Sequence, residues 1–268
     1  MENQNIAINS IRDLINRANE CDKDRDKCTL AIAIIKQKPD IIKDLKELSA
    51  FINELGITDD IYKKYLAIAI IEQNPDIIKG LTSSTLSNFI VNQLKITDDD
   101  YKREIAIAII KQKPETINDL TSSTLSNFIV KELKVTDDYC KKDLAIAIIE
   151  NKHDIIKDFT SSTLSNFIVN QLKITDDDYK REIAIAIIKQ NPDIIKDFTS
   201  SKALSDFIIY KLEITDDYCK KDLAIKIIKQ KPEILGNNKE EKGKGLSELI
   251  KAFGNDFYHR VDLEPIPK

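Results

Sequence analysis

The chain has 268 residues, of which 42% are hydrophobic and 32% are charged, and its formal net charge is −4. This composition excludes a disordered chain, and 41 Lys plus Arg against 45 Asp plus Glu give no basic excess of the kind that phosphate binding normally requires. Ile, Leu and Ala recur at helical intervals and glycine occurs only 6 times, so we expect an all-α protein.

A five-residue motif divides the chain into repeats. The sequence AIAII begins at Ala31, Ala67, Ala106, Ala145 and Ala184, and a related AIKII begins at Ala224. The successive spacings are 36, 39, 39, 39 and 40 residues. Periods of this size are typical of helical repeat proteins, in which each unit buries its apolar face against the next. The sequence therefore predicts a right-handed-type α-solenoid with a cap at each end.

We predict three parts in this array. Residues 1–30 form an N-terminal half-repeat cap, residues 31–235 form five tandem repeats plus a terminal half repeat, and residues 236–268 form a linker, a short helix and a tail. The cap is indicated by apolar residues on one helical stripe. These are Ile6, Ile11, Leu14, Ile15 and Ala18.

The segment CDKDRDKC at residues 21–28 resembles a calcium loop only in part. Asp22, Asp24 and Asp26 have the spacing of the first three ligands, but Lys27 stands where a glycine is required and Ala33 where the bidentate glutamate belongs. The segment is therefore predicted to be a charged turn between helices, and we expect no metal ligands in it.

Cysteine usage and the chain start indicate a reducing compartment. Cys140 and Cys219 occupy the same position two repeats apart, too far to bridge, which leaves Cys21 with Cys28 as the pair that could form a disulfide. Four thiols fit the cytosol. The first residues show no Sec-type signal, and no apolar run is long enough to span a membrane. We expect a cytoplasmic protein.

Each repeat is predicted to begin with a long helix. Thr97 and Asp98 supply a helix start, because their side chains can accept the unpaired N–H groups and their region adds negative charge at the positive end of the dipole. The following IAIAII is apolar on nearly every side and should be covered on nearly every side. Its strict alternation also permits a buried β-strand, but the capping signal upstream favours a helix.

A short turn and a second helix should complete the repeat. Prolines recur in one position after each long helix, where they end that helix or occupy the first turn of the next element. They are Pro39, Pro75, Pro114, Pro192 and Pro232. The sequence TSST from Thr121 then offers a second N-cap. Leu125, Phe128, Ile129 and Leu133 mark a one-sided, outer helix.

The pattern stops after Leu235. Residues 236–245 hold three of the six glycines and are interpreted as a flexible linker, followed by a short amphipathic helix at 246–253. Phe253, Phe257 and Tyr258 form an aromatic cluster in the tail. This end is either a cap over the last repeat or a docking peptide on a tether.

No recognised catalytic or metal-binding motif is present. His153 stands in the proline position of its repeat, and His259 has no Cys or carboxylate cluster at metal-ligand spacing. The sequence has no Gly-rich phosphate loop and no nucleophile elbow. We therefore expect no enzymatic activity, no cofactor and no metal.

Differences between repeats give the candidate binding residues. Two positions vary while the Ile and Leu positions stay apolar, which reflects either a lack of constraint at exposed positions or a graded surface that contacts a partner. The first position holds Glu72, Lys111, Glu150 and Lys189, which alternate in charge. The second holds Asn92, Lys131, Asn170 and Tyr210.

The unit FINELGITDDIYKKYLAIAIIEQNPDII at residues 51–78 resembles the helical repeats of α-solenoids. Its length is similar to HEAT and armadillo repeats, and its order of LG, capped helix and proline is similar to the mitochondrial transcription termination factor family. The resemblance covers roughly residues 31–235 and implies a solenoid. It assigns no functional residue to this chain.

These observations favour a monomeric, non-catalytic scaffold that binds a protein or peptide along the solenoid. The alternative is a nucleic-acid reader, which would require the cations of successive repeats to converge on one strip. These are Lys102, Arg103, Lys141, Lys142, Lys180 and Arg181. End-to-end self-assembly is a third hypothesis. The near-identical repeats and the Ile, Lys, Asn and Asp bias suggest a host-associated microbe and, as a hypothesis, an effector delivered into a host cell.

Overall fold

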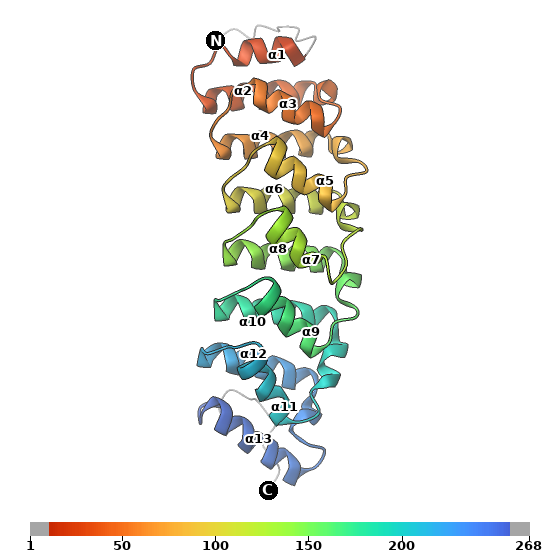
Figure 1. Ribbon diagram of the computed structural model, residues 1–268, viewed down its shortest axis with the longest axis vertical. Helices are drawn as coiled ribbons and strands as arrows, with labels where there is room; N and C mark the ends of the chain where they lie inside the picture. The colour runs from red at the N-terminus through yellow and green to blue at the C-terminus, as the bar shows by residue number, and fades with distance from the viewer. Residues whose placement is uncertain (1–10, 258–268) are drawn as a thin grey trace. The chain divides into compact units, whose positions relative to one another are not determined.

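The computed structural model describes residues 11–257, and within this range the chain is helical and contains no β-strand. Two compact units are present: unit 1 contains residues 1–120 and 128–140, and unit 2 contains residues 121–127 and 141–268. Each unit is an α-solenoid in which helices pack on their neighbours in the sequence (Figure 1). The predicted all-α solenoid is confirmed.

Six long helices, each of 14 residues, carry the repeated motif within residues 11–257. They are α2 (Asp24–Gln37), α4 (Asp60–Gln73), α6 (Asp99–Gln112), α8 (Asp138–Asn151), α10 (Asp177–Gln190) and α12 (Asp217–Gln230). Asp98 caps α6 by accepting a hydrogen bond from the Tyr101 N–H, as predicted. In unit 1, α4 packs against both α2 and α6, and in unit 2, α12 packs against α10. The alternation of IAIAII is thus accommodated in a helix.

A 3₁₀ turn follows each long helix, and proline occupies its first position in five of the six described cases. The turns are Pro39–Ile41, Pro75–Ile78, Pro114–Ile117, His153–Ile156, Pro192–Asp197 and Pro232–Leu235. Proline suits this position because its fixed φ favours a helical start and its missing N–H would have no partner there. The predicted role of the prolines is confirmed.

Short helices form the second half of each repeat. They are α3 (Leu45–Glu54), α5 (Ser83–Asn88), α7 (Leu125–Asn127), α9 (Ser161–Ser165) and α11 (Ser201–Asp206). Thr82 and Thr160 form capping boxes with the threonine three residues later. The TSST segments at Thr82 and Thr160 therefore start helices, whereas the residues of the TSST segment at Thr121 form a turn before α7 begins at Leu125.

A π-helical turn continues each short helix except α3, so the outer helix that we predicted is present but changes its hydrogen-bonding pattern partway along. These turns are Phe89–Gln93, Phe128–Glu132, Asn166–Gln171 and Phe207–Lys211. The Leu94 N–H donates to the Phe89 carbonyl oxygen at 2.9 Å, a step of five residues. The wider turn brings Phe89 and Leu94 to one side, where both are buried.

One residue with left-handed backbone ends each π-helical turn. Lys95, Lys134 and Lys173 have φ of 56°, 55° and 55°, and Glu213 has φ of 53°. The corresponding residue after α3 is Gly56, with φ of 64°. Glycine adopts this conformation without the steric cost that a Cβ imposes. The later repeats therefore accept local strain that the first repeat avoids.

The ends of the described chain are covered by single helices. The first, α1 (Ile11–Ala18), buries Leu14, Ile15 and Ala18, while Ile6 of the predicted stripe lies outside the described residues. The last, α13 (Lys239–Phe253), packs on α11 and α12 through Leu246, Leu249 and Phe253.

The predicted linker at residues 236–245 is wrong, because most of it belongs to α13. Asn238 caps this helix through the Glu241 N–H. A Cβ on Gly245 would lie 2.3 Å from the Leu235 carbonyl oxygen, so glycine here serves close packing. The rings of Phe253 and Phe257 are 5.4 Å apart, and Tyr258 and His259 lie outside the described residues.

Candidate interaction surface

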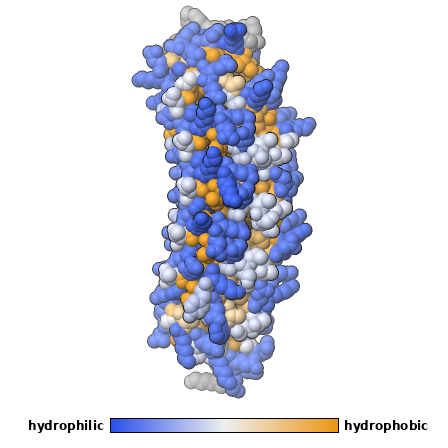
Figure 2. Space-filling view, viewed as in Figure 1, coloured by the Kyte–Doolittle hydropathy of each residue, from blue (hydrophilic) through white to orange (hydrophobic). Residues whose placement is uncertain are grey.

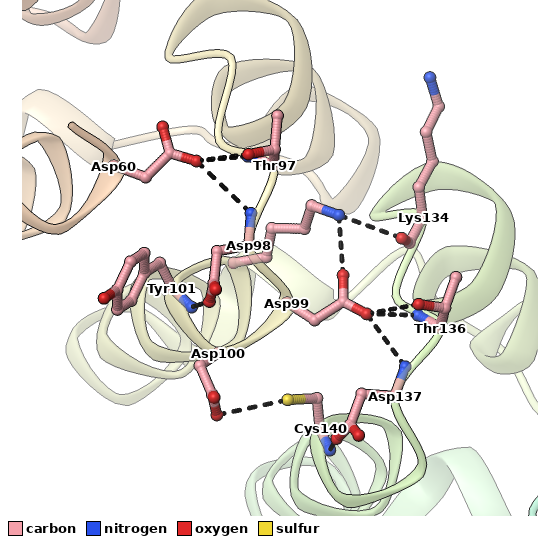
Figure 3. A network of polar contacts seen from close by, with 11 residues as sticks. Asp60, Thr97, Asp98, Asp99, Asp100, Tyr101, Lys134, Thr136, Asp137 and Cys140 are labelled. Atoms are coloured by element: carbon pink, nitrogen blue, oxygen red, sulfur yellow. Dashed lines mark hydrogen bonds and ion pairs between the residues drawn. The ribbon is translucent and has the colours of Figure 1, made fainter. Parts of the chain in front are cut away.

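A carboxylate at the amino end of four of the long helices, α2, α4, α6 and α10, binds the backbone of the next repeat, as Figure 3 shows for Asp60 and Asp99. The Asp99 carboxylate accepts hydrogen bonds from the Thr136 N–H at 2.7 Å, the Thr136 hydroxyl at 2.8 Å and the Asp137 N–H at 3.0 Å. Lys102 donates to the same carboxylate at 2.9 Å and to the Lys134 carbonyl oxygen at 3.1 Å. Asp99 therefore joins two repeats, whereas Asp98 caps its own helix.

The same arrangement recurs in both units. Asp24 binds Thr58 and Asp59, Asp60 binds Thr97 and Asp98, and Asp177 binds Thr215 and Asp216. Burial acts to raise the pKa of Asp99, but the hydrogen bonds from Lys102, Asp137 and Thr136 outweigh it and lower the pKa to about 2. The pKa values of Asp24, Asp60 and Asp177 are lowered by the same balance.

A second set of ion pairs runs between successive long helices inside each unit. Lys64 of α4 lies 2.7 Å from Glu104 of α6, and its Nζ lies 4.7 Å from the centroid of the Tyr101 ring. In unit 2, Lys142 lies 3.0 Å from Glu182. These cations are largely buried, so their charges are satisfied by the protein itself.

The cations expected to track nucleic acid are mostly held by carboxylates. Lys102 pairs with Asp99, Lys180 with Asp177, Arg103 with Asp100, Lys142 with Asp143 and Arg181 with Asp178. Lys141 is buried. A phosphate would have to displace these internal partners before it could pair with the same cations.

The solvent side of each long helix carries one partly exposed isoleucine, which we call the isoleucine row. Unit 1 holds Ile32, Ile68 and Ile107, and unit 2 holds Ile146, Ile185 and Ile225. On α6, Ile105, Ala106, Ile109 and Ile110 are fully buried, whereas Ile107 and Ala108 are not. The expectation that the long helix is covered on nearly every side is therefore wrong on this side.

The first set of predicted binding residues lies one turn beyond the isoleucine row. Glu72, Lys111, Glu150 and Lys189 are exposed near the carboxyl ends of α4, α6, α8 and α10. Each follows its isoleucine by four residues, so the two share one helix face. We call these four, with Lys36 and Lys229 at the same position of α2 and α12, the charged row.

The second predicted set lies on a different layer. Asn92, Lys131, Asn170 and Tyr210 are exposed on the π-helical turns that follow the short helices. The side chains of Asn92 and Asn170 donate to Asn88 and Asn166 on their own helices. The sequence thus identified exposed positions on two layers but missed the isoleucine row, whose only signal is that it stays apolar.

The surface in Figure 2 shows hydrophobic patches separated by hydrophilic side chains over both units. Large exposed apolar side chains include Tyr65, Tyr139, Tyr210 and Tyr218. Tyr139 packs under the Arg103 guanidinium, 4.7 Å from the ring centroid, and Tyr218 packs under Arg181. Apolar contact area is therefore available, and two of the tyrosines are held by arginines.

Reactive groups are few along residues 11–257. Among these residues no group of three or more His, Cys, Asp or Glu is placed to hold a metal ion. The four cysteines are free thiols. Burial raises the pKa of Cys28 to about 11, and burial together with the hydrogen bond to Asp137 raises the pKa of Cys140. Buried, protonated thiols are poor nucleophiles.

Comparisons with known proteins give one family. Residues 37–126 match the family described as FeoB cytosolic helical domain, which is about a third of the chain. No curated protein and no solved structure matches the chain. The matched family is not the HEAT, armadillo or mitochondrial transcription termination factor family, so the predicted resemblance to those families is not supported. The predicted helical repeat architecture agrees with the structure.

No helix in the described part of the chain has the length and the apolar character needed to cross a lipid bilayer.

Proposed function

We propose that the protein is a non-catalytic scaffold whose long-helix faces bind a segment of a partner protein. One observation carries this proposal: the isoleucine row is left partly exposed although the other isoleucines of the AIAII and AIKII motifs are buried. Burial of apolar surface drives most protein association. The charged row beside it supplies side chains that can orient and select a partner.

Charge pairing supports a protein partner over a nucleic acid. The cations that would bind phosphates pair with Asp99, Asp100, Asp143, Asp177 and Asp178. Proteins that bind nucleic acid present a surplus of unpaired Lys and Arg on one face. We therefore favour binding of a protein over binding of RNA or DNA.

The cellular location is proposed from the matched family and from the composition. The matched family is named for a cytosolic helical domain, which supports a cytoplasmic location for residues 37–126. We also propose a monomeric state and delivery into a host cell, on the basis of the composition and the near-identical repeats.

Capture from a cell lysate with paired variants tests the proposed function. The intact chain is used as bait with and without nuclease, at low and raised salt. In one variant Ile107 and Ile185, one in each unit, are changed to Glu. In the comparison variant Asn92 and Asn170, on the other layer of the same units, are changed to Glu. Partners that resist nuclease and salt and are lost only with Ile107→Glu and Ile185→Glu support the proposal.

The other outcomes contradict it. Loss confined to Asn92→Glu and Asn170→Glu would move the binding face to the short-helix layer. Recovery that vanishes with nuclease and falls steeply with salt would establish nucleic acid as the partner. Far-UV circular dichroism and thermal melting of each variant show whether a loss of capture reflects unfolding.

A further inference from the structure

A hollow lies between the first two long helices, entirely within unit 1. Its lining comes from α2 and α4 and combines apolar, aromatic and charged side chains. The lining includes Arg25, Cys28, Ile32, Lys36, Ile68 and Glu72. It therefore includes two members of the isoleucine row and two of the charged row.

At the hollow, a short cysteine stands where the next junction has the lysine of an interhelical ion pair. Counted from the repeated motif, Cys28 occupies the position of Lys64, and Tyr65 the position of Glu104. Lys64 reaches Glu104 across the α4 and α6 junction at 2.7 Å. Cys28 is buried and its thiol donates to the Tyr62 carbonyl oxygen at 3.6 Å, so it cannot fill the same space.

The hollow suits one large apolar side chain. Ile32, Ile68 and Ala69 form its apolar part, and Tyr62 and Tyr65 add aromatic surface. Tyr65 is 49% exposed, and the centroid of its ring lies 4.2 Å from the Lys64 Nζ, which packs on it. An aromatic wall held in this way offers contact area at a small cost in side-chain entropy.

The charges around the hollow favour a carboxylate. Arg25 and Lys36 are exposed and form no ion pair within residues 11–257, and Glu72 is the single acidic side chain of the lining. Cys28 adds no negative charge, because burial keeps its thiol protonated. The lining thus carries a net charge of +1, and Arg25 can pair with an incoming carboxylate in a bidentate manner.

We propose that this hollow binds a peptide segment of the partner protein that presents one large apolar side chain next to an acidic residue. The apolar side chain enters between α2 and α4, and the carboxylate pairs with Arg25. The inference rests on the proposed function and deepens it, because it names the chemistry of the bound segment.

A random peptide library displayed on phage, selected on the full chain, tests the inference. Parallel selection uses a chain in which Cys28→Lys and Tyr65→Glu rebuild the ion pair of the next junction. The two substitutions together leave the net charge unchanged. The equivalent position of α4 already holds a buried lysine, Lys64. We expect selection on the wild-type chain to enrich peptides that combine an acidic and a large apolar residue. Selection on the chain with Cys28→Lys and Tyr65→Glu, which we call the filled chain, should not enrich these peptides.

Arg25→Gln gives a second variant that leaves the buried core untouched. We expect recovered peptides to bind it about tenfold more weakly or worse, and replacing their acidic residue with its amide should then cause no further loss. Arg12→Gln, at an exposed arginine of α1 that does not line the hollow, is the matched control and should bind as the wild type does. Circular dichroism confirms that each variant is folded.

Three results would overturn the inference. Peptides that bind the filled chain and the Arg25 variant as well as the wild type bind elsewhere, which leaves a peptide-binding scaffold but not this site. Enrichment of basic or uncharged peptides contradicts the assigned chemistry. Absence of any enriched peptide contradicts the inference, while capture from lysate with the isoleucine variants still decides the proposed function independently.

Discussion

At the amino end of α6, Asp99 accepts three hydrogen bonds from the next repeat and pairs with Lys102, whereas at the carboxyl end Lys111 is exposed and forms no ion pair with any described residue. The amino end is built from contacts between residues 37 and 38 positions apart in the sequence. Substitutions there must preserve those contacts, while the carboxyl end can change its charge without loss of the fold.

The repeats show this difference directly. Asp24, Asp60, Asp99 and Asp177 make the same contacts, but the charged row changes between Glu and Lys from one repeat to another. Residues at the amino end of a long helix are therefore fixed because they join repeats. Residues at the carboxyl end can change and are available to a partner. The following predictions test that separation.

The largest effect is expected at the amino end. Asp99→Ala removes three hydrogen bonds and leaves the buried Lys102 without its carboxylate, so the free energy of unfolding should fall by about 3 kcal/mol. Chemical denaturation measures this change. The exposed Asp193, paired with Lys196, is the control, and Asp193→Ala should cost about 0.5 kcal/mol or less. Equal losses in the two variants would contradict the distinction.

The second-largest effect is expected at low pH, which should weaken the contacts between repeats at the amino ends of the long helices. The pKa of Asp99 falls from its ordinary value of 3.8 to about 2 in the folded chain. A lowered folded pKa contributes stability that is present above the unfolded value and is lost as the pH falls from 3.8 toward 2. In Asp99→Asn this contribution is missing at every pH. The difference in unfolding free energy between wild type and Asp99→Asn should therefore shrink over this range, and a constant difference would contradict the prediction.

A smaller gain is expected just before the long helix. Lys134 has φ of 55°, so Lys134→Gly should relieve backbone strain and stabilise the chain by about 0.5–1 kcal/mol. Its carbonyl oxygen, which accepts from Lys102, is retained. Lys131→Gly, in the preceding π-helical turn, should instead destabilise by about 1 kcal/mol. Thermal melting compares the two, and changes of the same sign would show that the left-handed residue carries no strain.

The smallest effect on stability belongs to the carboxyl ends. Lys111→Ala and Lys189→Ala should each change the free energy of unfolding by less than about 0.5 kcal/mol, because both side chains are exposed. The same changes should nevertheless weaken capture of a protein partner. Unchanged capture with both variants would remove the charged row from the binding face and leave the isoleucine row to be tested alone.

Local signals in the sequence were sufficient for the framework. Asp98 as an N-cap, the prolines after the long helices and the TSST caps at Thr82 and Thr160 all act over a few residues, and each is found in the structure. Such signals depend on backbone groups nearby in the chain, so they need no knowledge of the fold. The π-helical turns were missed because the step from Phe89 to Leu94 is fixed by burial against other helices.

The sequence by itself determined the class of the protein, the order of its elements and the exposed positions of the charged row. Tertiary structure decided which side of the long helix is left open, that Asp99 joins two repeats, and that a hollow forms where Cys28 replaces a lysine. These features depend on side chains that are roughly one repeat apart in the sequence and meet only when helices pack. A cap is satisfied within one turn, but an uncovered face is defined by what the neighbouring repeats fail to cover.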